Sequence, residues 1–349
     1  MFRKIIKMTI IMLLATILLN INNSEDVNAK VKKNKEDVAA LRKIIHYERK
    51  RDAWVGRSIN NKEQYTWNKE TGHLEKIKWY HKGLRGTLDL NELKHLTEVD
   101  VSCNKLKGIK VNKSRKIKKL NCFYNKIKVL KVGKLKKLKE LDCGDNKIKK
   151  LDLRKLKSLE TFKLSGVNTY INFREIKILW PKDKKNIKVL EFVEVYDIDL
   201  NFNLFSNLTE LCCWSCDLNT LNISKLKKLT ILDCGWNKLK KLDLTNQCKL
   251  KVLDCSDNNL RKLDLSNQPK LEELYCEINK LRRLDLSNQR NLKKLICFDN
   301  KLTKLDLSGK TQLNMLGYEP LKSTNVILTG CDESTIRLYD RDYYYYGIR

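Results

Sequence analysis

The chain has 349 residues, and its 72 Lys and Arg outnumber its 42 Asp and Glu, which gives a formal charge of +30. With only three prolines and 13 glycines, the composition excludes a proline- or glycine-rich linker, and no second region has a pattern of its own. So large a positive charge would by itself indicate a nucleic-acid binder, but the positions of the basic residues, described below, argue against it.

Residues 1–29 have the three parts of a secretory signal peptide: a basic start, a short apolar run and a cleavage triplet. An uncleaved anchor is the alternative, although the apolar run is too short to span a bilayer comfortably. We therefore expect a secreted, extracellular protein with no transmembrane segment in the mature chain, or one that its charge holds at the cell surface. The three parts are Arg3, Lys4 and Lys7, then Met8 to Leu19, then Val27, Asn28 and Ala29.

Residues 30–73 are predicted to form an N-terminal cap. Apolar residues recur at helical spacing from Val38 to Ile45, with Asp37 as the expected N-cap of that helix. Tyr65 and Trp67, followed by a polar turn and a second apolar stretch, indicate a hairpin. A cap is needed because the end of a stacked array would otherwise expose its core.

Residues 74–318 repeat with a period of 21, in the pattern L-x-x-L-x-C-x-x-N-x-L-x-x-L-D-L-S plus four variable residues. About 11 or 12 units fit, with an insertion near residues 166–186 that we expect to bulge as a loop. The remaining residues, 319–349, are expected to form a C-terminal cap or tail. The cysteines of the period are Cys122, Cys143, Cys213, Cys234, Cys255, Cys276 and Cys297.

Each unit is predicted to form a short strand followed by a bend. Leucine and cysteine alternate with variable residues, so they share one face of the strand. A coil that returns every 21 residues places successive strands side by side and parallel, about 4.8 Å apart. The asparagine then satisfies backbone groups at the bend, except where Val167, Val195 or Cys216 replaces it.

These repeats resemble the leucine-rich repeat family, and most of all its bacterial internalin-type branch with a cysteine ladder, in which cysteine takes the third leucine position. The resemblance covers roughly residues 74–318. It implies a leucine-rich repeat solenoid of the α/β-type repeat class, a curved right-handed coil with a concave parallel sheet. It also implies a binding protein rather than an enzyme, and it does not name the ligand.

Twelve cysteines in a secreted chain would ordinarily indicate disulfides. The ladder cysteines instead occupy an inward apolar position, where a thiol acts as a small hydrophobe. Their parallel Cβ directions would strain a disulfide between neighbours, so we expect buried free thiols. Four cysteines lie off the ladder and could pair or stay free: Cys103, Cys212, Cys248 and Cys331.

The residues at positions 3, 5, 7 and 8 of each unit, counted from its first leucine, should face the concave surface, and half of them are acids or aromatics. This face is the first candidate site, for a protein or a glycan, because aromatic residues usually carry binding energy. The alternative is that the aromatics pack on one another for stability. The candidates are Phe123, Tyr124, Trp214, Trp236, Tyr275, Phe298, Asp233, Asp254, Glu273 and Glu277.

Positions 10, 12 and 13 of the units carry mainly Lys and Arg, which would form a basic stripe along one flank. The stripe is the second candidate site, for an anionic cell-surface polymer or membrane surface. The simplest alternative is that these residues only keep the protein soluble. The candidates are Lys149, Lys150, Lys240, Lys241, Arg261, Arg282 and Arg283. Nucleic acid is not the expected partner, because the inner face is acidic.

No constellation of residues predicts an enzyme. Cys213 and Cys216 have the spacing of a redox pair, but both already have a place in the repeat. The four histidines show no metal-ligand spacing on one helix. We therefore predict no catalytic residue, no metal site and no cofactor, and we interpret the chain as a recognition module.

Overall fold

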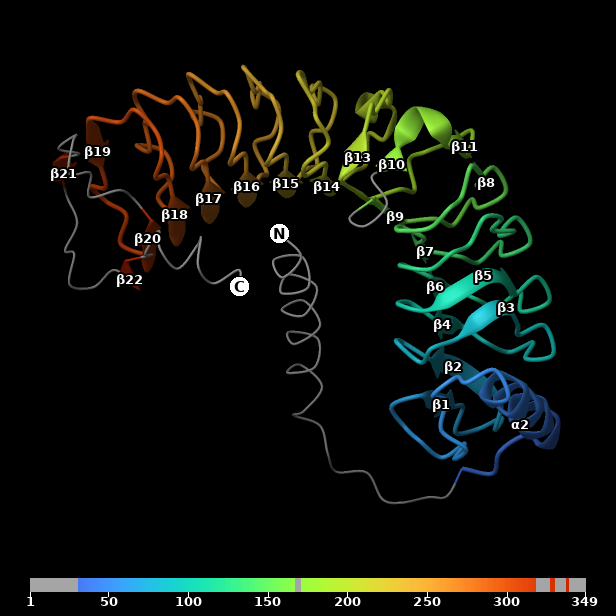
Figure 1. Ribbon diagram of the computed structural model, residues 1–349. Coiled ribbons are helices and arrows are strands. Elements are labelled where there is room, and N and C mark those ends of the chain that lie inside the picture. The colour runs from blue at the N-terminus through green and yellow to red at the C-terminus, as the bar shows by residue number, and fades with distance from the viewer. Residues whose placement is uncertain (1–30, 167–170, 318–326, 330–336, 339–349) are drawn as a thin grey trace.

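A computed structural model describes residues 31–166, 171–317, 327–329 and 337–338. The chain winds into a curved solenoid whose main sheet lines the inner side of the curve (Figure 1). The predicted solenoid with a concave parallel sheet is therefore confirmed. The signal peptide predicted for residues 1–29 lies outside the described residues, as does most of the predicted C-terminal cap.

The main sheet has 14 strands; β1 is antiparallel to β2, and the later pairs are parallel. Along the sheet the strands are β1 (Tyr65–Trp67), β2 (Leu74–Lys78), β4 (Glu98–Asp100), β6 (Lys119–Asn121), β7 (Glu140–Asp142), β9 (Thr161–Ser165), β12 (Val189–Val193), β14 (Glu210–Cys212), β15 (Ile231–Asp233), β16 (Val252–Asp254), β17 (Glu273–Tyr275), β18 (Lys294–Ile296), β20 (Met315–Gly317) and β22 (Arg337–Leu338). One short strand per coil is what the alternating leucine and cysteine predicted.

Two-stranded parallel sheets lie outside the main sheet, toward the outer side of the curve (Figure 1). They are β3 (Arg85–Asp89) with β5 (Lys105–Lys110), β8 (Lys150–Asp152) with β11 (Lys177–Leu179), β10 (Ile171–Asn172) with β13 (Val195–Tyr196), and β19 (Lys304–Asp306) with β21 (Ile327–Thr329). Two 3-10 turns, Phe173–Glu175 and Phe202–Leu204, complete this side. The outer side is thus less regular than the inner one.

The register of the main sheet follows from the repeat. Leu232 pairs with Leu253, and Leu253 with Leu274, so each coil sets its leucine beside the leucine 21 residues later. All three are fully buried. Because a buried leucine stabilises a fold by roughly 1.5–3 kcal/mol, stacking the coils gives a continuous core that no single unit could form.

The ladder cysteines lie within this core as predicted. All seven are buried free thiols, at most 3% exposed. Burial raises the pKa of each of them, so none is a ready nucleophile. Of the cysteines off the ladder, Cys248 is exposed, Cys103 and Cys212 are half-buried free thiols, and Cys331 lies outside the described residues.

The asparagine that ends each strand holds neighbouring coils together. The amide of Asn258 donates to the carbonyl oxygens of Cys234, Cys255 and Ser256 at 3.0–3.2 Å. Its Oδ1 accepts from the backbone N–H of Leu239 at 2.9 Å. Where Cys216 replaces asparagine, its Sγ donates to the carbonyls of Phe192 and Trp214, so the thiol takes over part of this role. That engagement and its burial, which raises the pKa of Cys216 to about 12, do not favour a redox function.

A second ladder, of glutamines, was missed because these residues fall in the four positions that the sequence pattern left as variable. The Nε2 atoms of Gln247, Gln268 and Gln289 donate at 2.7–2.9 Å to carbonyl oxygens of the preceding coil. All three side chains are buried. The repetition of Asn-Gln after the serine or threonine of these units was the available signal.

Helix α2 (Lys35–Arg49) covers the first coils and buries Leu41, Ile44 and Ile45. Its N-cap is Asn34, whose side chain accepts from the N–H of Asp37 at 3.0 Å, so the expectation that Asp37 caps the helix is wrong. The N–H of Asp37 is a first-turn donor with no partner in the helix backbone, and the side chain of Asn34 supplies its acceptor. Among the described residues, no helix is both long enough and apolar enough to traverse a bilayer.

The insertion near residues 166–186 is more than a bulging loop. Its described part includes β10, a 3-10 turn and β11, and β11 pairs with β8. Trp180 packs edge-on against Phe162 and Phe205, with ring centroids 5.2 and 5.1 Å away. The insertion therefore folds onto the core, because its apolar side chains, Trp180 among them, pack against it.

Candidate binding surface

The strands present alternate side chains to the concave surface. In β14, Leu211 points inward and is 1% exposed, whereas Glu210 and Cys212 on either side of it are partly exposed. Positions 3 and 5 therefore face outward in this unit, as expected, whereas Ile296 at position 5 of a later unit is buried. This orientation makes the concave sheet a preformed surface with little freedom to lose on binding.

Trp214 and Trp236 form one aromatic pair on this surface. Their rings lie 5.5 Å apart at 39°, and both are partly exposed, so they pack on each other and still face solvent. Gly235 makes room for the pair, because a Cβ there would lie 3.2 Å from Cδ1 of Trp214 and 3.0 Å from Oδ1 of Asp254. The two rings therefore pack on each other, as the alternative expected, and keep exposed surface that a ligand could contact.

Acids line the sheet beside the tryptophans. Asp233 and Asp254 are register partners in β15 and β16. Oδ1 of Asp233 accepts from the N–H of Gly235 at 3.1 Å, and Oδ1 of Asp254 accepts from the N–H of Ser256 at 2.9 Å. Burial, followed by the nearby charge of Asp254, raises the pKa of Asp233 to about 8. The surface therefore resists full ionisation at neutral pH unless positive charge approaches it.

The same pattern extends toward the N-terminal half of the sheet. Burial, with the neighbouring Glu191, raises the pKa of Asp142 to about 7. Lys163 lies between these acids in the register and forms an ion pair with Glu191 at 2.6 Å. The acidic row is thus partly neutralised here, whereas Asp233 and Asp254 are direct register partners with no lysine between them in the register.

Tyr275 and Glu273 continue the surface on β17. The hydroxyl of Tyr275 donates to Oε2 of Glu273 at 2.7 Å, and Nζ of Lys294 lies 4.9 Å from the centre of the tyrosine ring. Burial, then the bond to Glu273, raises the pKa of Tyr275. These contacts hold the phenol in a defined position next to Asp254, its register partner.

Two of the predicted contact residues, Glu277 and Phe298, are only 2% exposed and are not available to a ligand. Both occupy position 7, a position that is partly exposed in some coils, as at Trp214, and buried in these two. At Gly144, also position 7, a Cβ would come within 2.4 Å of the backbone nitrogen of Ser165. The prediction that both belong to the binding surface is therefore wrong.

Phe123 and Tyr124 lie apart from the tryptophans, on the unit that opens at Ile117. Their rings are 6.2 Å apart, and Tyr124 is 42% exposed. Between that unit and the one that holds Trp214, the sheet contains β7, β9 and β12. The candidate residues thus form two groups, and only the group around Trp214 and Trp236 combines aromatics with a continuous pair of acids.

An exposed aromatic group at the N-terminal end was missed. Trp54 and Tyr80 are 68% and 54% exposed, and both rings lie near His81, at 6.2 and 6.0 Å. Tyr80 and His81 occupy positions 7 and 8 of the partial unit that opens at Leu74. Extending the repeat register by one unit would have identified these two residues.

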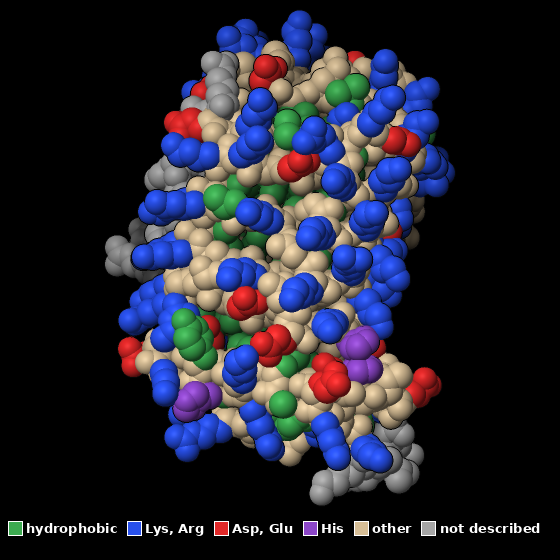
Figure 2. Space-filling model, turned by 90° about the vertical axis from the view of Figure 1, so that its right-hand side faces the viewer, with side chains coloured by type: hydrophobic (Ala, Val, Ile, Leu, Met, Phe, Trp, Pro, Cys, Tyr) green, Lys and Arg blue, Asp and Glu red, His purple; other side chains and the backbone are tan. Residues whose placement is uncertain are grey.

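The flank residues of the second candidate site are all exposed. Figure 2 shows Lys and Arg spread over the side that lies to the right in Figure 1, with few acids among them. Along the edge of the sheet, in contrast, Glu160 lies between Lys139 and Lys188 at 2.6 and 2.9 Å, so those lysines are paired. Farther along the flank, an open groove of about 500 Å³ is lined by Arg261, Arg282 and Arg283 together with Asp264 and Asp285.

Comparisons with known proteins give the fold. No family model matches the sequence, and no curated protein matches it. Among solved structures, the functional domain of InlJ from Listeria monocytogenes, which includes a cysteine ladder, is 24% identical with a TM-score of 0.54. That match covers 76% of this chain and 62% of the InlJ structure, so the chain spans less than two thirds of it.

A second internalin structure, InlF from Listeria monocytogenes, is 20% identical with a TM-score of 0.60. The match covers 72% of this chain and 74% of that one. Together with the buried thiols and the coil register, these likenesses confirm the fold that the sequence predicted. The chain therefore has a leucine-rich repeat solenoid fold similar to that of these internalin structures, with a cysteine ladder in its core.

Proposed function

We propose that this protein is a secreted recognition module that binds a partner protein through the concave surface around Trp214, Trp236, Asp233 and Asp254. The observation that carries the proposal is the partly exposed tryptophan pair, 5.5 Å apart, beside two register-paired acids on a rigid sheet. Desolvated aromatics at the centre of a surface are the usual source of binding energy. The rigid sheet keeps the ordering cost of binding low.

The charge of the surface indicates the chemistry of the partner. Because burial and mutual repulsion raise the pKa of Asp233, a Lys or Arg brought by the partner would stabilise the ionised acids. A neutral glycan could stack on the tryptophans but would not relieve that repulsion. A protein segment with an aromatic or aliphatic anchor next to a basic residue therefore fits best.

Affinity measurements on variants test this function. Extracellular proteins and glycans are passed over the immobilised chain at low and moderate salt, and the affinity of each retained molecule is then measured. Trp214→Ala and Trp236→Ala should each weaken binding tenfold or more, which is about 1.4 kcal/mol. Tyr47→Ala, a change of an exposed aromatic on α2, is the matched control and should leave affinity unchanged. Equal affinities for all three variants would refute the proposal. Selective retention of a neutral glycan would refute the part of the proposal that names a protein as the partner.

The groove of Arg261, Arg282 and Arg283 favours a second function, attachment to an anionic cell-surface polymer. Binding to heparin, used as a model polyanion, should then weaken steeply as salt rises. Arg282→Gln with Arg283→Gln should reduce both the affinity and the salt dependence. Lys139→Gln, which removes a lysine already paired with Glu160, is the matched control and should change neither. Salt-insensitive binding that is lost in the tryptophan variants would exclude this second function.

A further inference from the structure

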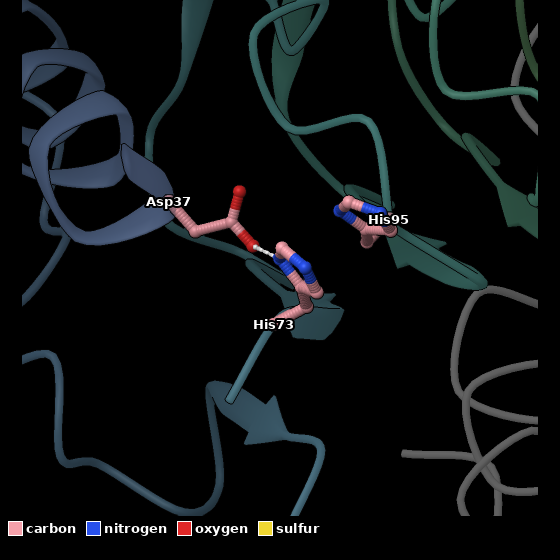
Figure 3. Close-up of side chains that lie close together, drawn as sticks. All are labelled: Asp37, His73 and His95. Carbon is pink, nitrogen blue, oxygen red and sulfur yellow. Dashed lines mark hydrogen bonds and ion pairs between the residues drawn. The ribbon is translucent and has the colours of Figure 1, made fainter. Parts of the chain in front are cut away.

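Three metal-ligating side chains meet where the cap joins the first coils. Asp37 comes from α2, His73 directly precedes β2, and His95 lies in the coil before β4 (Figure 3). One ligand atom from each residue lies within 4.8 Å of the others. Asp37 and His73 lie 36 positions apart in the sequence, and His73 and His95 lie 22 apart. Only the folded structure shows that the three side chains come together.

The contacts within this cluster leave donor atoms for a ligand. Nδ1 of His73 lies 3.0 Å from Oδ2 of Asp37, and that oxygen also accepts from the N–H of Leu74 at 2.9 Å. The rings of His73 and His95 stack with centroids 3.5 Å apart. Nδ1 of His95 is buried and has no hydrogen-bond partner in the part of the chain that the structure describes. A buried nitrogen without a partner is costly in a purely structural cluster.

We propose that Asp37, His73 and His95 bind a divalent zinc ion that joins the N-terminal cap to the first two coils. Two ligands of a tetrahedral zinc with bonds of about 2.0–2.1 Å lie about 3.3 Å apart, close to the 3.0 Å between His73 and Asp37. The ion would replace the proton that this pair shares. It would also give the buried nitrogen of His95 a partner, after a shift of at most about 1.5 Å, since the ligand atoms lie within 4.8 Å of one another.

The donor set selects the class of ion. Two imidazoles with one carboxylate suit zinc and similar transition metals, whereas calcium and magnesium prefer all-oxygen sites. Three protein ligands leave a fourth position for water. Because the ligands belong to three separate elements, ion binding stabilises the docking of the cap.

Zinc binding is measured on the purified full-length chain, with zinc alone as the probe and cobalt as its spectroscopic substitute. Cys248→Ser serves as the background, because Cys248 is the exposed thiol among the described cysteines. One zinc per chain is expected, with a rise in the unfolding midpoint when zinc is added. The cobalt spectrum should lack a sulfur-to-metal charge-transfer band.

His95→Gln is the decisive variant, because its Nδ1 makes no hydrogen bond that the change would remove. It should weaken zinc binding by more than about 100-fold and abolish the zinc-induced rise in midpoint. Asp37→Asn should act the same way and serves as the second variant, while His46→Gln and His81→Gln are matched controls that should bind like the parent. Absence of bound zinc, full binding by His95→Gln, or a sulfur charge-transfer band would each overturn the proposal.

Discussion

At the scale of single residues, position 5 of the repeat combines two roles. Asp233 accepts the N–H of Gly235 and so ends its strand, and it also faces the concave surface. Asn121 makes the same bond to the N–H of Phe123 in its own unit, which shows that the turn does not need a charge. The acid at Asp233 is therefore available for recognition, at a cost in stability when it ionises.

Asp233→Asn should flatten the dependence of stability on pH. The folded pKa of Asp233 is raised from 3.8 to about 8, so its stabilising contribution is full below about pH 4 and is lost as pH rises through 8. The wild type should lose about 2 kcal/mol or more relative to Asp233→Asn between about pH 5 and pH 9. Denaturant unfolding at several pH values measures this, with Asp243→Asn as the control. The pKa of Asp243 is lowered, so Asp243→Asn should change stability only at acid pH. If both variants showed the same dependence of stability on pH, the raised pKa of Asp233 would be contradicted.

The asparagine ladder predicts a large effect from one buried amide. Asn258→Ala removes three donated bonds and one accepted bond and leaves buried backbone groups unpaired. It should lower the free energy of unfolding by about 3 kcal/mol. The neighbouring Asn259→Ala, which removes a side-chain bond to exposed Lys280, should cost less than about 0.5 kcal/mol. The loss of stability in Asn258→Cys should lie between these two values, since Cys216 donates to backbone carbonyls at the same position of its own coil. A loss as large as that of Asn258→Ala would show that a thiol does not replace the amide.

At the scale of elements, the sequence predicts regular coils well and irregular ones poorly. Strand positions, the thiol ladder and most of the outward positions 3 and 5 follow from the period, because each coil has the same residue types at the same positions. The burial of Glu277 and Phe298 does not follow, because it depends on the neighbouring coil. The fold of the insertion depends on packing between Trp180 and distant aromatics, which no local pattern contains.

Trp180→Ala tests whether the insertion is part of the core. The change removes contacts with Phe162 and Phe205 and should destabilise the chain by about 2–4 kcal/mol. Trp54→Ala, at a residue that is 68% exposed, should have an effect within about 0.5 kcal/mol. Equal effects of the two changes in thermal or denaturant unfolding would show that the insertion does not pack as described.

At the scale of the whole molecule, function depends on which side chains the coil turns outward. The concave surface of Trp214 and Trp236 and the basic flank are both assigned from one register, in which the thiols face the core. The period predicted that register from the sequence alone. The grouping of candidate residues follows from the same period, because the main sheet keeps its strands in chain order. Which of the outward positions are buried, as at Glu277 and Phe298, could not be predicted in the same way.

Alkylation of the native protein with a bulky maleimide, mapped residue by residue by mass spectrometry, tests this register most directly. Cys248 should react at once, because it is exposed, and it serves as the internal control. Cys234, Cys255 and Cys276 should react only after denaturation, because they are fully buried. Rapid labelling of these three in the folded chain, at a rate like that of Cys248, would contradict the coil and with it both assigned surfaces.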